Sequence, residues 1–192
     1  KKMKAFLILE DGHIFTGTSI GSQKEVISEI VFNTSMTGYL EVLTDPSYAG
    51  QAVTMTYPLI GNYGINFSDM ESKRPWVKGF ITRELSRTAS NFRCEGSIQD
   101  FLEKHDIPGI AGIDTRALTK LLREKGTMNG MITTDENYDL DKILLQLAAY
   151  EVGNVVDEVT CSEPSVLKGN GKKVALLDFG AKQNIARSLN KR

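Results

Sequence analysis

The sequence predicts a layered domain that mixes strands and helices, of the α/β or α+β kind rather than a doubly wound sheet. Three observations lead to this prediction. Strand-like segments dominate the early part of the chain, helix-like segments follow them, and an Asp-Gly turn joins the first two strands directly. Such a turn makes a hairpin, which is an antiparallel pair and not the start of a parallel βαβ unit.

The strands are predicted from β-prone segments that end at turn residues. Residues 5–9 and 13–16 flank Asp11-Gly12, which is the strongest short-range signal for a hairpin. Further strands are predicted over 26–33, 51–57 and 77–82, with a loop rich in glycine and charge over 61–75.

Three helices are predicted from capping residues followed by apolar residues at helical spacing. Ser97 starts the first helix with a sequence that resembles a capping box. Asp114 starts the second, which Gly126 ends, and Asp139 starts the third. A short strand over 107–113 is expected between the first two helices.

The end of the chain predicts the opening unit of a second sheet. Residues 153–171 have the composition of a linker. Residues 174–177 read as a buried strand, Gly180 as a turn, and 180–192 as an amphipathic helix. About twenty residues cannot bury a core of their own. We therefore expect a first domain over 1–152, a linker over 153–171 and a truncated second domain over 172–192. Without its own sheet, the apolar face of the helix must dock on the first domain, exchange onto another copy or fray, and we expect disorder, high mobility or a crystal-contact role for the last twenty residues.

Composition places limits on partners. The chain has 192 residues and a net charge of −1, so no bulk electrostatic attraction to nucleic acid or anionic lipid is expected. No apolar stretch reaches the ~20 residues that span a bilayer, so no membrane is expected either. The two cysteines, Cys94 and Cys161, lie far apart and show no metal-binding spacing. This usage predicts a reducing cytoplasm and no metal site.

The chain offers little for covalent catalysis. A cysteine nucleophile needs a histidine base and a sharp exposed turn, and neither cysteine lies in a Gly-x-Cys-x-Gly elbow. The histidines, His13 and His105, lie near a hairpin turn and a helix end. Residues 174–192 contain neither of the glycine-rich phosphate-binding motifs. We therefore assign no catalytic residue and no cofactor to this chain.

Two polar features remain as candidates. Arg116, Lys120 and Arg123 lie at i, i+4 and i+7 on the second predicted helix, so they share a face. That face is either solvated or a contact for an acidic partner surface, with about equal weight.

Asp45-Pro46-Ser47-Tyr48 has the chemistry of a type I turn with an exposed Ser47 hydroxyl. Such groups most often satisfy the turn backbone itself, and a hydrolase using Ser47 is disfavoured because no histidine lies nearby in sequence.

Several longer motifs carry a family resemblance. They run from end to end of the chain: LEDGHIFTG (9–17), FNTSMTGYLEVLTDPSYAGQ (32–51), TYPLIGNYG (56–64), ASNFR (89–93), GIDTRALTKLLREKG (112–126) and DFGAKQNI (178–185). With these motifs the chain resembles the small, glutamine amidotransferase subunit of carbamoyl-phosphate synthetase.

The resemblance implies a fold in two parts. The N-terminal domain of that family is a three-layer β/β/α sandwich of the swivelling type. The second domain is a flavodoxin-like class I amidotransferase that carries a Cys nucleophile with His and Glu. Glutamine is hydrolysed there, and ammonia passes to a large subunit. With bicarbonate, ATP and Mg, this cytoplasmic heterodimer makes carbamoyl phosphate for arginine and pyrimidine biosynthesis, which is a ligase reaction.

The resemblance carries one site residue over to this sequence. The serine of the family's Asp-Pro-Ser-Tyr loop helps to bind L-glutamine, and here it is Ser47. The catalytic Cys, His and Glu have no matching positions, so the chain is expected to be inactive alone. The alternative is a non-catalytic interaction domain that docks the glutaminase domain onto the large subunit, with Arg116, Lys120 and Arg123 as one contact.

Overall fold

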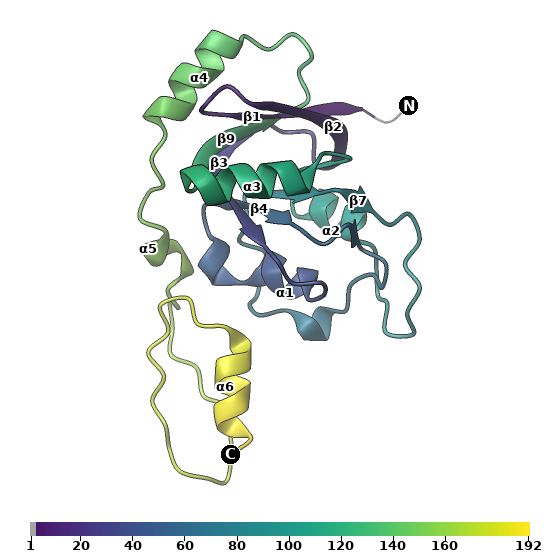
Figure 1. The fold of residues 1–192 in the computed structure, drawn as a ribbon. Coiled ribbons are helices and arrows are strands. Elements are labelled where there is room, and N and C mark those ends of the chain that lie inside the picture. Colours follow the sequence, from purple (N-terminus) through teal and green to yellow (C-terminus); the bar gives the residue numbers. More distant parts are fainter. Residues whose placement is uncertain (1–2) are drawn as a thin grey trace.

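Seven strands close into a barrel in the order β1-β2-β8-β6-β4-β3-β9. The computed structural model describes residues 3–192, and Figure 1 shows their path. The barrel strands are β1 (Lys4–Leu9), β2 (Ile14–Gly21), β3 (Val26–Asn33), β4 (Gln51–Met55), β6 (Gly79–Thr82), β8 (Pro108–Ala111) and β9 (Met128–Thr133). Two short strands, β5 (Leu59–Ile60) and β7 (Glu84–Leu85), pair outside the barrel. The mixed α/β prediction is confirmed.

The barrel combines antiparallel and parallel pairing. β1 and β2 form the predicted hairpin, and Gly12 takes a φ of 86° in its turn. β3, β4, β6 and β8 run parallel to one another. Their carboxyl ends therefore meet at one edge of the sheet. β9 pairs antiparallel with both β1 and β3 and closes the circle.

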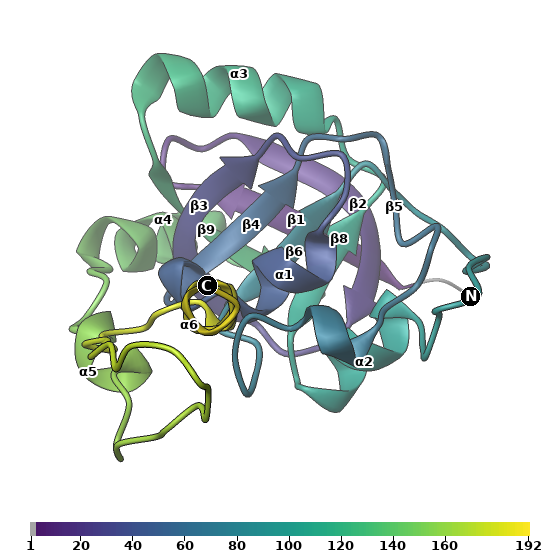
Figure 2. The same ribbon diagram turned by 90° about the horizontal axis from the view of Figure 1, so that it is seen from below.

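Helices α1 (Tyr39–Thr44), α2 (Ile98–Lys104), α3 (Thr115–Lys125) and α4 (Leu140–Ala149) lie against the barrel on several sides (Figures 1 and 2). α5 (Val155–Val159) and α6 (Gln183–Asn190) lie apart from it, and 3-10 turns occur at Pro46–Tyr48 and Phe67–Asp69. The predicted caps are present: Ser97, Asp114 and Asp139 each accept a hydrogen bond from a backbone N–H in the first turn of α2, α3 and α4. Gly126 ends α3 with a φ of 92°.

The core divides into three clusters that follow strand alternation. One cluster takes residues from β1, β3, β4, β6, β8 and β9 together with Leu118 and Leu122 of α3, and we assign it to the barrel interior. A second lies between α1, α2 and the outer side of β4 and β6. The third places Ile143 and Leu147 of α4 against Ile8 and Met131 of β1 and β9.

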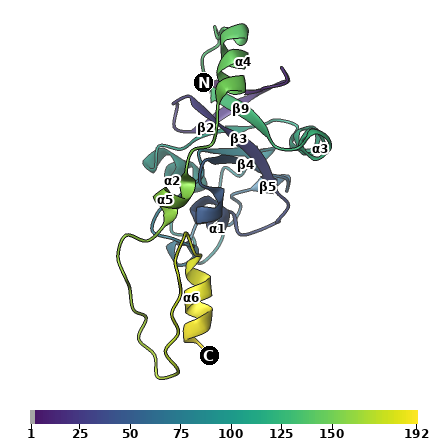
Figure 3. The same ribbon diagram turned by 90° about the vertical axis from the view of Figure 1, so that its left-hand side faces the viewer.

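Residues 174–177 do not form the predicted strand. Val174 and Leu177 are 64% and 79% exposed, and no strand of the described chain pairs with this segment. A strand needs a partner for its backbone N–H and C=O groups, so apolar composition alone does not make one. The helix prediction is confirmed as α6, which extends away from the barrel (Figure 3). The linker contains the short helix α5.

The apolar residues of α6 are not packed into the barrel core. Ile185 and Leu189 remain 46% and 43% exposed. The helix is instead attached to the rest of the molecule at its N-terminal end, as described below. The apolar face of α6 therefore does not dock on the first domain, and the mobility expected of the last twenty residues stays a prediction.

We predict that Gly109→Ala destabilises the barrel. A Cβ at Gly109 in β8 would lie 2.6 Å from the Phe80 backbone oxygen of β6 and 2.9 Å from Ile20 Cγ1 of β2. Such overpacking costs about 1–3 kcal/mol of unfolding free energy, which urea denaturation measures. Gly153→Ala is the matched control, because a Cβ there has no atom within 4 Å. Equal stability of the two variants would contradict the tight strand packing.

Candidate functional site

The Ser47 turn is held by the carboxylate of Asp45. Asp45 Oδ1 accepts a hydrogen bond of 2.9 Å from the Ser47 backbone N–H. Asp45 is only 5% exposed, whereas Ser47 is exposed at the surface. Pro46 begins the 3-10 turn between them. The turn chemistry predicted from the sequence is therefore present, and Ser47 is exposed on a turn whose backbone is hydrogen-bonded to Asp45.

The second oxygen of Asp45 holds a residue from the far end of the chain. Lys182 Nζ donates to Asp45 Oδ2 at 2.7 Å. This hydrogen bond raises the pKa of Lys182 above its ordinary value of 10.5. Because the folded-state value is raised, the contribution of this contact to stability is complete below pH 10.5 and is lost as the pH rises through the raised value. One buried carboxylate thus joins the Ser47 turn to the segment before α6.

That segment folds back tightly on itself. Asp178 Oδ1 accepts hydrogen bonds from the backbone N–H groups of Gly180 at 2.9 Å and Ala181 at 2.7 Å. Gly180 has a φ of 100°, and a Cβ there would lie 2.6 Å from Val159 Cγ2 and 3.2 Å from Pro46 Cβ. Only glycine fits this position, because both the backbone conformation and the space exclude a side chain.

Glu71 caps the start of α6. Its backbone oxygen accepts from the Gln183 N–H at 2.8 Å, and its carboxylate accepts from the Asn184 backbone N–H at 3.0 Å and from Asn184 Nδ2 at 2.5 Å. A carboxylate is favourable at a helix N-terminus, where backbone N–H groups lack partners within the helix. Glu71 is 6% exposed. Sequence reasoning missed it, since it lies in a segment that reads only as loop.

The loop around Glu71 is tied to the Ser47 region. The Glu71 N–H donates to Thr44 Oγ1 at 2.9 Å, and Ser72 Oγ donates to the Thr44 backbone oxygen at 2.6 Å. Ser72 Oγ also accepts from Trp76 Nε1 at 2.8 Å. Arg74 stacks over the Trp76 ring, 3.7 Å from its centroid. These bonds make the 44–48 turn, the 71–76 loop and the start of α6 one connected unit.

Helix α1, which leads into Asp45, is anchored by two tyrosines. The rings of Tyr39 and Tyr63 stack with centroids 4.3 Å apart. Tyr39 Oη donates to the Gly64 backbone oxygen at 2.6 Å, and the Gly38 N–H donates to Tyr63 Oη at 2.7 Å. Burial raises the pKa of Tyr39 far above its usual range, so its hydroxyl stays a hydrogen-bond donor. The tyrosine pair thus holds α1, and α1 in turn holds the start of the Ser47 turn.

The basic residues predicted on one helix face all line a cleft. Arg116, Lys120 and Arg123 of α3 border a cavity of about 790 Å³ together with Arg83, which follows β6. Thr34 and Thr56, which follow β3 and β4, also line this cavity. Ser47 precedes β4 and Thr56 follows it, so the two candidate sites lie at opposite ends of that strand. Arg83 was not predicted, because only the fold brings it to α3.

The cysteines and histidines do not form a catalytic pair. His13 Nδ1 lies 3.0 Å from Asp11 Oδ1, and the His105 ring lies 4.5 Å from that of Phe101. Cys161 is exposed and Cys94 half-buried, and both are free thiols. Within residues 3–192, no three His, Cys, Asp or Glu side chains gather as a metal site, and no helix could cross a membrane.

Comparisons with known proteins identify relatives. The family model described as "Carbamoyl-phosphate synthase small chain, CPSase domain" matches residues 7–132. Curated proteins named "Carbamoyl phosphate synthase small chain" are 55% identical in Clostridium perfringens and 50% identical in Listeria monocytogenes, each over 190 residues. Among solved structures, an aminopeptidase from Aneurinibacillus sp. strain AM-1 aligns over 69% of this chain and 32% of its own, with a TM-score of 0.40 and 17% identity. That last likeness is too low to carry an argument.

Each match covers nearly all of this chain but only about half of the relative. The Clostridium match covers 99% of this chain and 54% of its relative, and the Listeria match covers 98% and 52%. The chain thus spans about half the length of the curated relatives it matches. Because the family model covers most of the sequence from β1 to β9, the chain belongs to the carbamoyl-phosphate synthase small chain family.

Proposed function

We propose that this chain acts within the small subunit of a glutamine-dependent carbamoyl-phosphate synthase. The observation that carries the proposal is 55% identity over 99% of the chain to a protein of that name. The subunit would hydrolyse L-glutamine and pass ammonia to a large subunit. That subunit would use bicarbonate, ATP and Mg to make carbamoyl phosphate for arginine and pyrimidine biosynthesis. We place this ligase in the cytoplasm, which suits the free thiols of Cys94 and Cys161.

The domain division belongs to the same proposal. Residues 1–152 would be the N-terminal domain, in which the two sides of the closed sheet and the helices packed on it would be the layers of a β/β/α sandwich of the swivelling type, followed by a linker over 153–171. Residues 172–192 would open the flavodoxin-like glutaminase domain, whose remainder would supply the catalytic Cys, His and Glu. The chain alone would then be inactive. The exposed Leu177 and the exposed face of α6 support this division, because both are apolar surfaces suited to burial in a larger domain.

Ser47 is the residue that we assign to glutamine binding. Its hydroxyl is exposed on a turn that Asp45, Thr44 and the tyrosine pair hold in place. A hydroxyl so placed can both donate to and accept from the polar groups of an amino acid. The adjacent Lys182 and α6 belong to the segment that would lead into the glutaminase domain. The pocket would therefore form at the junction of the two domains.

Lys182 acts in this proposal as a positioning residue. It touches Asp45, and Asp45 touches the Ser47 backbone, so the lysine acts on the turn through the shared carboxylate. Lys182 is itself about half exposed, which keeps the energy of the pair small. The role of the lysine is to fix the position of the segment over 178–184 relative to the Ser47 turn.

The large subunit is the proposed protein partner. In the alternative reading, docking is the main work of the domain, with Arg116, Lys120 and Arg123 as a contact for acidic residues. These side chains are exposed on one face of α3. Complementary charges of this kind act mainly on association rate and specificity, and salt weakens them.

The glutamine assignment predicts a selective loss in the Ser47→Ala variant. In the complete small chain with its large subunit, the variant should raise KM for glutamine about three- to tenfold, the cost of one lost hydrogen bond. Synthesis from added ammonia should be unchanged. Steady-state kinetics with both nitrogen sources measure this, and Ser165→Ala, at an exposed serine in the linker, is the control. A Ser47→Ala enzyme with an unaltered KM for glutamine would refute the assignment.

The positioning role predicts faster amide exchange in a Lys182→Met variant of this chain. Residues 178–184 and the Ser47 amide should exchange about two- to fivefold faster, the effect of losing one partly exposed ion pair. Lys182→Arg should retain slow exchange, and Lys191→Met, at the far end of α6, should change neither segment. Hydrogen exchange at neutral pH distinguishes these cases. Acceleration at 178–184 with no change at Ser47 would show that the carboxylate does not couple them.

The docking alternative predicts salt-sensitive binding through α3. Changing Arg116, Lys120 and Arg123 to Glu should weaken capture of the large subunit at low salt by at least about tenfold, because like charges then face each other. A control with the same net charge changes Arg87, Lys104 and Lys142, which are exposed elsewhere. Pull-down at two salt concentrations measures the effect. Equal capture of both triple variants would remove the α3 face from the interface.

A further inference from the structure

The cleft beside α3 lies where binding sites are common in parallel sheets. Thr34 follows β3, Thr56 follows β4 and Arg83 follows β6, and these strands are parallel neighbours. α3 begins shortly after the fourth parallel strand, β8, and supplies the other wall. Ligands of parallel sheets bind outside the carboxyl ends of the strands. The volume of about 790 Å³ is that of a small-molecule site.

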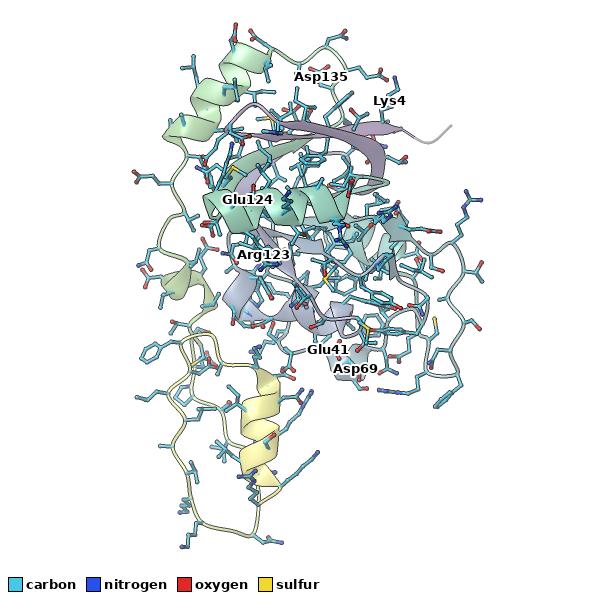
Figure 4. The ribbon with its side chains drawn as sticks, viewed as in Figure 1. Lys4, Glu41, Asp69, Arg123, Glu124 and Asp135 are labelled. Carbon is cyan, nitrogen blue, oxygen red and sulfur yellow. The ribbon has the colours of Figure 1, made fainter. Side chains whose placement is uncertain are left out.

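Positive charge dominates the lining of this cleft. It contains the side chains of Arg83, Arg116, Lys120 and Arg123, and Glu124 is the acidic one among them. Glu124 lies 3.8 Å from Lys120 Nζ. Among the residues that the structure describes, no carboxylate lies within 4.0 Å of the three guanidinium groups. Figure 4 places Arg123 and Glu124 together on α3.

Carboxylates lie nearby, but none of them pairs with the arginines of the cleft. Lys125, on the same helix, pairs with Asp11 at 2.8 Å. Asp114 accepts a hydrogen bond from the Ala117 N–H and so caps the helix. Glu84 and Asp114 line an adjoining cavity of about 490 Å³ with Arg83 but form no ion pair with it. The cleft therefore keeps an excess of positive charge that the folded chain itself does not neutralise.

Hydroxyl groups add directional donors to the same walls. Thr119 is already committed, since its hydroxyl donates to the Thr115 backbone oxygen at 2.7 Å. Thr34 and Thr56 make no side-chain hydrogen bond within residues 3–192, and they line the same cleft as the arginines. Guanidinium groups bind carboxylate or phosphate through two parallel N–H donors, and threonine hydroxyls can complete such a contact.

We propose that this cleft binds a small molecule bearing at least two oxyanion groups, either phosphates or carboxylates. Arg83 would hold one group at the ends of the strands, and Arg116 and Arg123 would hold the other along α3. The concave shape favours a small ligand over a flat acidic protein surface, because the four cations line a cavity from two sides. The inference does not depend on glutamine chemistry, since Ser47 lies at the other end of β4.

Binding of pyrophosphate and of citrate to this chain tests the proposal. Calorimetric titration at constant ionic strength should give saturable 1:1 binding of at least one probe with a Kd of about 1 mM or tighter. The tighter probe assigns phosphate or carboxylate. The double variant Arg83→Gln, Arg123→Gln should weaken binding at least about tenfold. Arg87→Gln, at an exposed arginine outside the cleft, should leave it unchanged.

Two results would overturn the proposal. One is the absence of saturation by either probe at roughly ten times the expected Kd. The other is equal weakening by Arg87→Gln, which would mean diffuse attraction to surface charge. An unchanged urea transition in each variant establishes that binding is compared between folded proteins. If neither probe binds while charge reversal of α3 abolishes capture of the large subunit, the face serves a protein partner instead. The family assignment and the role of Ser47 would stand in each case.

Discussion

β9 lies between β1 and β3 and pairs with both, and the remaining architecture depends on this double pairing. A sheet that closes on itself has no free edge, so every strand position is fixed by two neighbours. Gly130 in the middle of β9 permits the close approach, since a Cβ there would lie 2.7 Å from Ile30 Cγ1. Closure also creates the interior that Leu118 and Leu122 of α3 help to fill. The closure by β9 therefore also fixes the positions of the four parallel strands and of the two candidate sites at their ends.

The two ends of β4 serve different purposes. At its start, buried carboxylates are fully used: Asp45 holds a turn and a lysine, and Glu71 caps α6. At its other end, cations line a cleft without a matching set of carboxylates. A saturated network rigidifies, because each polar group already has its partners. An unsaturated one leaves binding capacity for a group from outside. The same strand thus separates a structural junction from a surface open to a ligand.

The sequence predicted correctly those features that depend on contacts between residues close together in the chain. The Asp11-Gly12 hairpin and the caps Ser97, Asp114 and Asp139 are contacts between near neighbours, and all are present. β9 was missed because its short MNGMIT sequence has a central glycine and no clear alternation, while its pairing with β1 joins distant parts of the chain. For residues 174–177 the error is the reverse: their apolar composition predicted a strand, but no neighbouring strand is there to pair with it. Glu71 and Arg83 could not be predicted as site residues, because only the tertiary fold brings Glu71 to α6 and Arg83 to α3.

The sequence contains one tryptophan, and the fold places it beside the attachment of the C-terminal segment. Its indole N–H is bonded to Ser72, the residue after Glu71, and its ring is covered by Arg74. Release of α6 from Glu71 would disturb this loop and alter the polarity around the ring. The molecule therefore contains a single indole beside this attachment, and we expect its fluorescence to report whether α6 is seated there, with no added dye.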